Sequence, residues 1–286
     1  MIPYKRTVPP LHWQSQLLLL LVIPACSMWI FFQFLDAWQR HDAILLQTAG
    51  ISLAFGLVVW GLRAATGPAA ATGALITACL YLRSPGWRTA LIPLLAMLVL
   101  TLVSTRIGRE RKEEVGTAED RHGRSASQVA ANLGAAALAS IPLTAAQLFS
   151  PSSQTSLAAI AAIGAALAEA TADTLSSELG QVFGGEPRLL TTMRRVPAGT
   201  DGGVTLAGTA AGCIGAALVT AIAAVTLSLD AKLATVIFSC GILGLFADSL
   251  LGAVFERRGW LNNDAVNFLS TVIAAVTAAW FSHFSL

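Results

Sequence analysis

The residues best able to do chemistry in this 286-residue chain are carboxylates that interrupt long apolar stretches. Glu169 and Asp173 are four residues apart and therefore share one helical face. Asp248 lies near the end of a later apolar stretch, and Asp264 begins the next one. A carboxylate inside a membrane span is costly unless it is paired or binds a ligand. We therefore predict that Asp173, Asp248 and Asp264 converge as metal ligands, a structural polar network being the alternative.

Amide side chains accompany these carboxylates. Asn132 follows a basic loop, and Asn263 and Asn267 lie on either side of the last carboxylate in sequence. Hard oxygen ligands of this kind suit Mg²⁺, which is typically held by one or two carboxylates plus substrate phosphates. We expect the three asparagines to orient ligands or the metal's waters, and Glu178 to be a weaker metal-ligand candidate.

A glycine-rich segment supplies a second element. Asp201, Gly202 and Gly203 precede an apolar stretch, and the N-terminus of a helix there is a ready anion site. Arg194 and Arg195, just upstream, can clamp phosphate oxygens. We therefore expect Asp201 and the two glycines to cradle phosphate, and the two arginines to offset the charge on phosphate.

Three of the polar features also have simple structural explanations, and these alternatives remain open. In the first alternative, Asp201 only caps the following helix. Gln128 and Asn132 join two helices by hydrogen bonds. The charge-mixed run RERKEE at 109–114 is then a solvated surface and no part of a site.

Composition places these residues in a membrane protein. The chain is 55% hydrophobic and 12% charged, where soluble domains carry about 25% charged residues. Its net charge of +2 argues against nucleic-acid binding. Uninterrupted apolar runs of about 18 or more residues indicate membrane spans, so we predict an all-α, polytopic transmembrane bundle with about nine spans. The predicted spans are 14–35, 44–62, 67–83, 87–104, 129–149, 155–179, 204–228, 231–255 and 264–284.

The basic residues predict the orientation of this bundle. With a cytoplasmic N-terminus, 14 of the 18 Lys and Arg residues fall on the inside, which agrees with the positive-inside rule. Four stretches interrupt the apolar pattern with polar residues, namely 105–124, 169–185, 194–203, and Asp248 with 262–267. In this orientation all four face the cytoplasm, and the C-terminus lies outside. The alternative role of Arg194, Arg195, Arg257 and Arg258 is to anchor this topology. We expect an inner or plasma membrane location and an uncleaved first span.

Several short motifs occur in a fixed order. They read TRIG at 105–108, AED at 118–120, QVAANLG at 128–134, ADTLSSELG at 172–180, RRVPAGTDGGVTLAG at 194–208, ADSLLGA at 247–253 and NNDAVNFLST at 262–271. In these motifs the chain resembles the integral membrane proteins that include the plant phytyl-phosphate kinase and the animal transmembrane protein 19. The resemblance covers 44–286 and implies a prenyl-phosphate kinase-like membrane domain there. Residues 1–43, with the first span, have no clear counterpart in that family.

The resemblance extends to CTP-dependent prenol and dolichol kinases, which carry a pattern close to DxxAxxxGxxxG. Here the pattern begins at Asp173 and continues with Ser176, Gly180 and Gly184. Ser176 replaces the usual Ala, a small change that leaves room for a nucleotide. The resemblance thus implies that Ser176, Gly180 and Gly184 contact the nucleotide.

The expected function is CTP-dependent, Mg²⁺-assisted phosphorylation of an isoprenyl monophosphate, either phytyl, geranylgeranyl or farnesyl phosphate, to the diphosphate. The nucleotide and acceptor come from the resemblance. The prenyl tail is expected among the Ala/Gly-rich helices, where Gly208 and Gly212 form a GxxxG step. One alternative is a prenol kinase, with Glu178 or Asp201 as base, or a cytidylyltransferase. Another is a cation- or proton-coupled transporter, although no internal repeat is evident.

Overall fold

The computed structural model describes residues 12–39, 41, 43–82, 89–118, 123–149 and 153–284. Its helices are α1 (His12–Gln39), α2 (Ile44–Gly61), α3 (Gly67–Tyr81), α4 (Leu91–Arg106), α5 (Arg109–Val115), α6 (Ala126–Phe149), α7 (Ser153–Phe183), α8 (Leu206–Thr226), α9 (Ala231–Leu251), the π-helix η1 (Gly252–Glu256) and α10 (Asn263–Ser282). Two strands, β1 (Arg188–Leu189) and β2 (Gly203–Val204), pair antiparallel, with Arg188 opposite Val204. The all-α prediction is therefore confirmed apart from this short hairpin.

Each of the nine predicted spans overlaps one helix, and α5 is an additional short helix. Among the described residues, six helices are long and apolar enough to cross a membrane, namely α1, α2, α7, α8, α9 with η1, and α10. The apolar helices α3 and α4 are shorter. A membrane-crossing helix must satisfy its backbone hydrogen bonds internally, which explains why these runs are helical.

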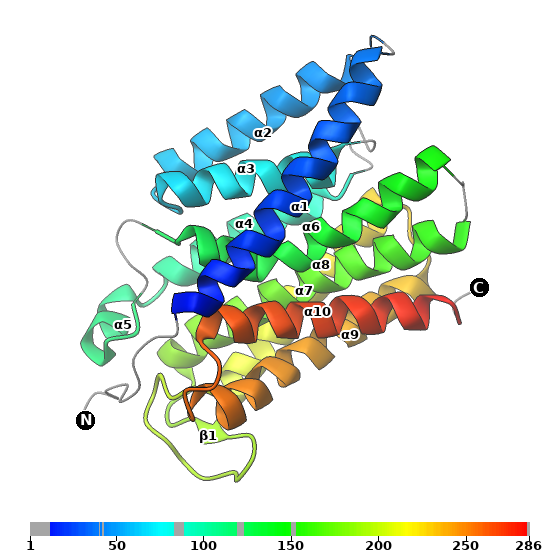
Figure 1. Cartoon of the computed structure of the whole chain (residues 1–286). Helices are drawn as coiled ribbons and strands as arrows, with labels where there is room; N and C mark the ends of the chain where they lie inside the picture. The colour runs from blue at the N-terminus through cyan, green and yellow to red at the C-terminus, as the bar shows by residue number, and fades with distance from the viewer. Residues whose placement is uncertain are drawn as a thin grey trace.

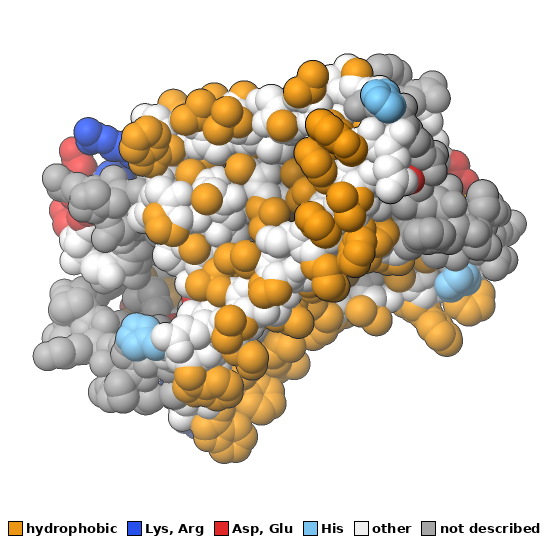
Figure 2. Space-filling model, turned by 45° about the horizontal axis from the view of Figure 1, so that its top comes forward, with side chains coloured by type: hydrophobic (Ala, Val, Ile, Leu, Met, Phe, Trp, Pro, Cys, Tyr) orange, Lys and Arg blue, Asp and Glu red, His pale blue; other side chains and the backbone are white. Residues whose placement is uncertain are grey.

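Helix α7 runs through the middle of the bundle (Figure 1). It contacts α4, α6, α8, α9 and α10. Its apolar window is 78% buried, against 22% for α1 and 28% for α2, so the first two helices lie at the periphery. Figure 2 shows hydrophobic side chains spread over an outer face of the molecule. Leu20, Leu46 and Leu53, on α1 and α2, are more than 60% exposed, as expected for side chains that face lipid.

Helix α8 packs against α7 through the predicted GxxxG step. A Cβ atom added at Gly208 would lie 2.6 Å from the Ser176 carbonyl oxygen, and one added at Gly212 would lie 2.8 Å from that of Ala172. No side chain fits at either position while the two backbones stay this close. The GxxxG step therefore brings the two helices together, as the sequence predicts.

Long-range contacts gather the polar stretches at one end of the bundle. The main chain of Arg124 bonds with that of Ala64 and Thr66, which joins the α5–α6 loop to the α2–α3 connection. Gln14, at the start of α1, donates to the Trp260 carbonyl in the η1–α10 loop. Helix α5 and the β1–β2 region also lie at this end in Figure 1. Lys5, Arg6, Arg40, Arg83, Arg88, Glu119 and Asp120, which the sequence argument uses, lie outside the described residues.

The orientation of this end toward the cytoplasm is a testable prediction. Cysteines introduced by Glu113→Cys and Glu186→Cys should react with a membrane-impermeant maleimide only after the cells are permeabilised. Lys232→Cys, in the first turn of α9 at the other end, should react in intact cells. The unsubstituted protein is the control, since three of its four cysteines are buried. Opposite labelling of the Glu113 and Glu186 positions would overturn both the span arrangement and the shared face.

Candidate active site

A polar cavity of about 250 Å³ lies at the loop-rich end, bounded by α6, α7, α9 with η1, α10 and the segment 198–205. Eleven of the fifteen site residues predicted from the sequence line it: Asn132, Asp173, Ser176, Glu178, Gly180, Asp201, Gly202, Gly203, Asp248, Asn263 and Asn267. The other four, Gly184, Arg194, Arg195 and Asp264, do not. The structure thus brings together most of the predicted site from parts of the chain far apart in sequence.

Two carboxylates from different helices form the acidic part of the cavity. Asp173 on α7 and Asp248 on α9 lie close enough to interact, and both line the cavity. Ser270 of α10 donates a hydrogen bond to Asp248 Oδ2 at 3.4 Å. Glu256, a residue that the sequence analysis did not select, adds a further carboxylate from η1, and Glu178 and Asp201 also line the cavity. A π-helical turn often occurs at a functional site, and this one ends α9 beside the cavity.

Arg124 supplies the positive charge of this cavity. Its guanidinium donates to Thr174 Oγ1 at 3.3 Å and interacts with the Asp173 carboxylate. Its backbone N–H donates to the Ala64 carbonyl, and its own carbonyl accepts from the Thr66 N–H, both at 3.0 Å. The sequence analysis did not select Arg124 as a site residue. Its place in the site depends on this long-range backbone pairing, which has no local sequence signal.

The two arginines predicted to offset phosphate charge lie away from the cavity. Arg194 and Arg195 are exposed in the segment between β1 and β2, and Arg195 forms an ion pair with Glu186 at 3.0 Å. Leu189 donates its N–H to the Arg194 carbonyl, so this segment folds back on β1. The hairpin therefore turns both side chains outward, which accords with the alternative that they anchor the topology.

The third predicted metal ligand, Asp264, faces the first helix. Ser15 of α1 donates a hydrogen bond to Asp264 Oδ2 at 2.6 Å. The neighbouring Asn262 caps α10 by accepting from the Ala265 N–H at 2.9 Å. It also donates to Ser15 Oγ at 3.0 Å. In the part of the chain that the structure describes, no group of three Asp, Glu, His or Cys side chains is arranged to hold a metal ion.

The glycine-rich segment is shaped by tight packing against η1. Gly202 has a φ of +73°, and a Cβ atom there would collide with the backbone of Ala253. The Gly203 N–H donates to the Thr200 carbonyl at 2.9 Å and closes the turn, so it does not point at a ligand. Gly202 and Gly203 line the cavity, but this backbone donor is occupied.

Helix α8 begins later than the sequence argument assumes. Its N-cap is Thr205, whose hydroxyl accepts from the Gly208 N–H at 3.0 Å. The explanation of Asp201 as a helix cap is therefore wrong, since β2 separates it from the helix. A Cβ atom at Gly184 would collide with the same Thr205 hydroxyl, which makes Gly184 a packing residue in this structure.

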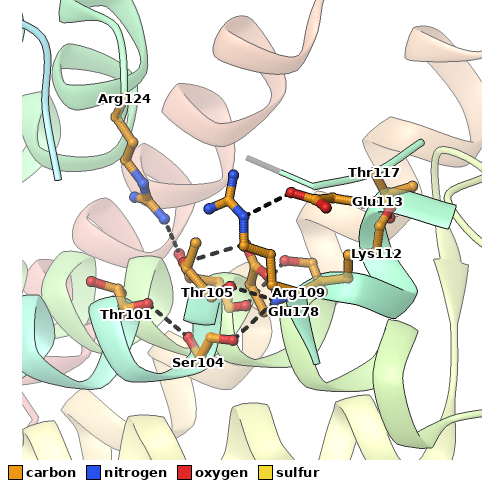
Figure 3. A network of polar contacts seen from close by, with 11 residues as sticks. Thr101, Ser104, Thr105, Arg109, Lys112, Glu113, Thr117, Arg124 and Glu178 are labelled. Atoms are coloured by element: carbon orange, nitrogen blue, oxygen red, sulfur yellow. Dashed lines mark hydrogen bonds and ion pairs between the residues drawn. The ribbon is translucent and has the colours of Figure 1, made fainter. Parts of the chain in front are cut away.

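The charged run at 109–114 is largely solvated, as that interpretation expects, since residues 110, 111, 113 and 114 are exposed, but Lys112 is a buried exception. Lys112 is 1% exposed and forms an ion pair with Glu178 of α7 at 2.5 Å. The same ammonium donates to the carbonyls of Ser104 and Thr105 at 3.1 Å and 2.7 Å (Figure 3). Thr105 also donates to the other Glu178 oxygen at 3.4 Å. This network fixes α5 and the end of α4 on α7.

Asn132 and Asn267 meet between α6 and α10. Asn267 donates to Asn132 Oδ1 at 3.5 Å, and Asn132 donates to the Gln128 carbonyl at 2.8 Å. The two asparagines therefore connect α6 with α10, as the structural alternative expects. They also line the cavity together with Asn263, and a role in orienting a ligand stays a prediction.

The buried ion pair yields a stability prediction. Lys112→Met leaves Glu178 charged and buried without its partner, which should destabilise the fold by about 3–5 kcal/mol. The double variant Lys112→Met/Glu178→Leu should recover most of that loss, because an apolar pair can replace a buried ion pair. Thermal unfolding in detergent measures both. Glu113→Gln is the control, since its ion pair with Arg109 is 34–40% exposed and contributes at most about 1 kcal/mol.

Gly202 allows a matched comparison with Gly185. Both have a positive φ, +73° and +66°, so alanine at either costs about 1–2 kcal/mol in backbone strain. Only at Gly202 would the added Cβ collide with a neighbour, whereas at Gly185 it meets nothing within 4 Å. Gly202→Ala should therefore destabilise the protein in detergent distinctly more than Gly185→Ala. Equal unfolding temperatures would contradict the close approach of this turn to η1.

Comparisons with known proteins place the chain among membrane proteins. Residues 50–275 match the family model described as Integral membrane protein DUF92. A Synechocystis relative, "Uncharacterized membrane protein sll0875", is 32% identical over 240 residues, covering 83% of this chain and 87% of the relative. The archaeal "Uncharacterized membrane protein MJ0933" of Methanocaldococcus jannaschii is 46% identical over 110 residues, covering 38% of this chain and 46% of the relative.

A plant relative also matches. "Protein VTE6, chloroplastic" of Arabidopsis thaliana is 28% identical over 196 residues, covering 67% of this chain and 58% of the relative. The chain thus spans about half the length of the archaeal and plant relatives. No solved structure matches. The matched segment includes every helix from α3 to α9, and the chain therefore belongs to the integral membrane protein family DUF92 and is a multi-pass membrane protein.

Proposed function

We propose that this protein transfers a phosphoryl group from CTP to an isoprenyl monophosphate and so forms the diphosphate. The observation that carries the proposal is the pair Asp173 and Asp248, which share one polar cavity with Arg124 at the end of a membrane bundle. Phosphoryl transfer depends on positioning two anions and neutralising their charge. A cavity with both carboxylates and a guanidinium has the groups for a metal and for phosphate.

The acidic groups suit a magnesium–nucleotide complex. Mg²⁺ is usually bound by one or two carboxylates together with the substrate's phosphates, so a cage of three protein carboxylates is not required. Asp173 and Asp248 would hold it, and Glu256 lies close to Asp248. When bound, Mg²⁺ shields the repulsion between donor and acceptor phosphates. Ser176 and Gly180 line the same cavity, and the absence of a side chain at Gly180 also lets Thr205 and Gly208 come close.

A monophosphate acceptor fits these residues better than an alcohol does. The second pKa of a phosphate monoester is about 6, so near neutral pH its oxygen is a nucleophile without a general base. That oxygen bonds to the γ-phosphorus of the donor, the bond to the bridging oxygen breaks, and CDP leaves. Of the two candidate bases for an alcohol, Glu178 is already paired with Lys112, which leaves Asp201. Arg124 offsets the charge of the two phosphates as they approach.

The carboxylates provide the central test of this function. Asp173→Asn and Asp248→Asn keep the size of the side chain and remove its charge. Each should lower turnover of CTP with farnesyl monophosphate by at least about 100-fold, which corresponds to roughly 2.7 kcal/mol. Detergent-solubilised protein should remain monodisperse. Asp230→Asn is the matched control, because Asp230 caps α9 at the other end and Asn also caps well.

The products separate this function from its alternatives. A prenyl-phosphate kinase releases CDP and a prenyl diphosphate, a prenol kinase releases CDP and a prenyl monophosphate, and a cytidylyltransferase releases pyrophosphate. A transporter that uses the carboxylates as ion sites shows no dependence on nucleotide. Asp264→Asn is informative in the same assay. Because Asp264 bonds Ser15 away from the cavity, we expect less than about a tenfold loss. A loss as large as that of Asp173→Asn would restore it as a metal ligand.

A further inference from the structure

A second cavity, of about 310 Å³, lies between α2, α3, α4 and α6. Its walls are largely apolar, with Phe55, Val59, Met97, Leu98 and Leu133 among the lining residues. The sequence argument placed the prenyl tail among the Ala/Gly-rich helices, but α7 and α8 pack together at the GxxxG step. This second cavity is therefore the better place for an apolar chain.

One end of this apolar cavity is strongly basic. Arg63, Arg106, Arg109 and Arg124 line it, and none of the described residues lining it is Asp or Glu. The four arginines come from the α2–α3 connection, the end of α4, the start of α5 and the loop before α6. These segments lie at the loop-rich end of the bundle, whereas the apolar walls are helical. A cavity with an apolar interior and a guanidinium-lined end is complementary to an anion that carries one hydrocarbon chain.

The apolar and polar cavities meet at two residues. Arg124 and Asn132 line both of them. The guanidinium of Arg124 reaches Thr174 and Asp173 on the polar side. On the other side, the Arg124 backbone is fixed to Ala64 and Thr66 beside the apolar cavity. An anion at this junction would have its chain in one cavity and its charged group facing the carboxylates of the other.

We propose that the apolar cavity binds the chain of an isoprenyl monophosphate, and that its four arginines hold the phosphate at the junction with the polar cavity. This inference deepens the proposed function and rests on it for the identity of the acceptor. Arginine is suited to the phosphate because its planar guanidinium binds two oxygens at once. An uncharged prenol would offer no negative charge to Arg63 and Arg106, whereas Arg109 already pairs with Glu113 and Arg124 already interacts with Asp173. The polar cavity then receives the nucleotide from the other side of Arg124.

The test measures binding of radiolabelled farnesyl monophosphate to purified protein in detergent, without nucleotide or Mg²⁺. Leu98→Trp fills the apolar cavity and should weaken binding at least about tenfold. Val99→Trp, the next residue on α4, is the control because Val99 is 58% exposed and does not line the cavity. Arg106→Gln should weaken the binding of farnesyl monophosphate at least about tenfold, because a charge-assisted hydrogen bond is lost. The binding of farnesol should stay within a factor of about two.

Arg111→Gln is the control for the arginine, since Arg111 is on α5, is exposed and does not line the cavity. Inorganic phosphate and phosphatidic acid serve as competitors. Displacement by inorganic phosphate alone, or equal displacement by two-chain phosphatidic acid, would overturn the single-chain site. Unchanged binding in both Leu98→Trp and Arg106→Gln would also overturn it. Should Leu98→Trp fail to fold, Arg106→Gln decides.

Failure of this inference can be told apart from failure of the proposed function. The Asp173→Asn variant should bind farnesyl monophosphate at least as tightly as the unsubstituted protein, since Asp173 does not line the apolar cavity and its negative charge competes with the phosphate for Arg124. Binding that depends on Leu98 and Arg106, in a protein without CTP-dependent turnover, would keep the lipid-phosphate site and refute the kinase. Turnover that is normal in both Leu98→Trp and Arg106→Gln would keep the kinase and refute the site.

Discussion

The structure depends on the close packing of α7, a long helix buried in a membrane bundle although it carries Glu169, Asp173 and Glu178. Charged side chains are costly there unless the neighbouring helices come near enough to supply partners, as α5 does for Glu178. Glu169 is buried although neither of its carboxylate oxygens has a hydrogen-bond partner among the described residues. Small residues make that approach possible. Gly241 and Gly244 bring α9 against α7, and a Cβ atom at Gly244 would collide with the Glu169 side chain. The same small-residue packing that gives the bundle its density therefore sets the acidic groups at fixed places on α7.

Two acidic residues of α7, Glu178 and Asp173, have different roles because their neighbouring groups differ. Glu178 is neutralised by the buried Lys112, and this ion pair holds α5 against the bundle. Asp173 lies in an open cavity with Arg124 and a second carboxylate, Asp248. A carboxylate with a dedicated cation is a structural group, because breaking the pair costs several kcal/mol. A carboxylate that shares its surroundings with another carboxylate is better suited to bind a cation with a substrate. On the same helix, Glu178 therefore stabilises the fold, and Asp173 is placed to bind a ligand.

The two cavities suit the two parts of the proposed substrate, because one is apolar and the other is polar. An isoprenyl phosphate combines a chain that prefers the hydrocarbon region with a charged group that prefers the interface. Arginines at the end of the apolar cavity lie where such a phosphate would be. Arg124 borders both cavities because its backbone is fixed by Ala64 and Thr66. The α2–α3 connection, which has no acidic or metal-binding residue, thereby becomes part of the site's construction.

The sequence by itself determined the helical membrane class and the helix positions, and most of the site residues predicted from it line the polar cavity. Apolar run length and small-residue spacing are local properties, and the motifs around Asp173 and Asp248 carry their own polar signal. Only the tertiary structure decided which charged side chains enter the site. Arg194 and Arg195 point outward on a hairpin, Asp264 bonds Ser15, and Lys112 is buried. Arg124 enters because a loop pairs with another loop about 60 residues away. The direction in which each charged side chain points depends on contacts between distant segments. Neither composition nor residue spacing predicts those contacts.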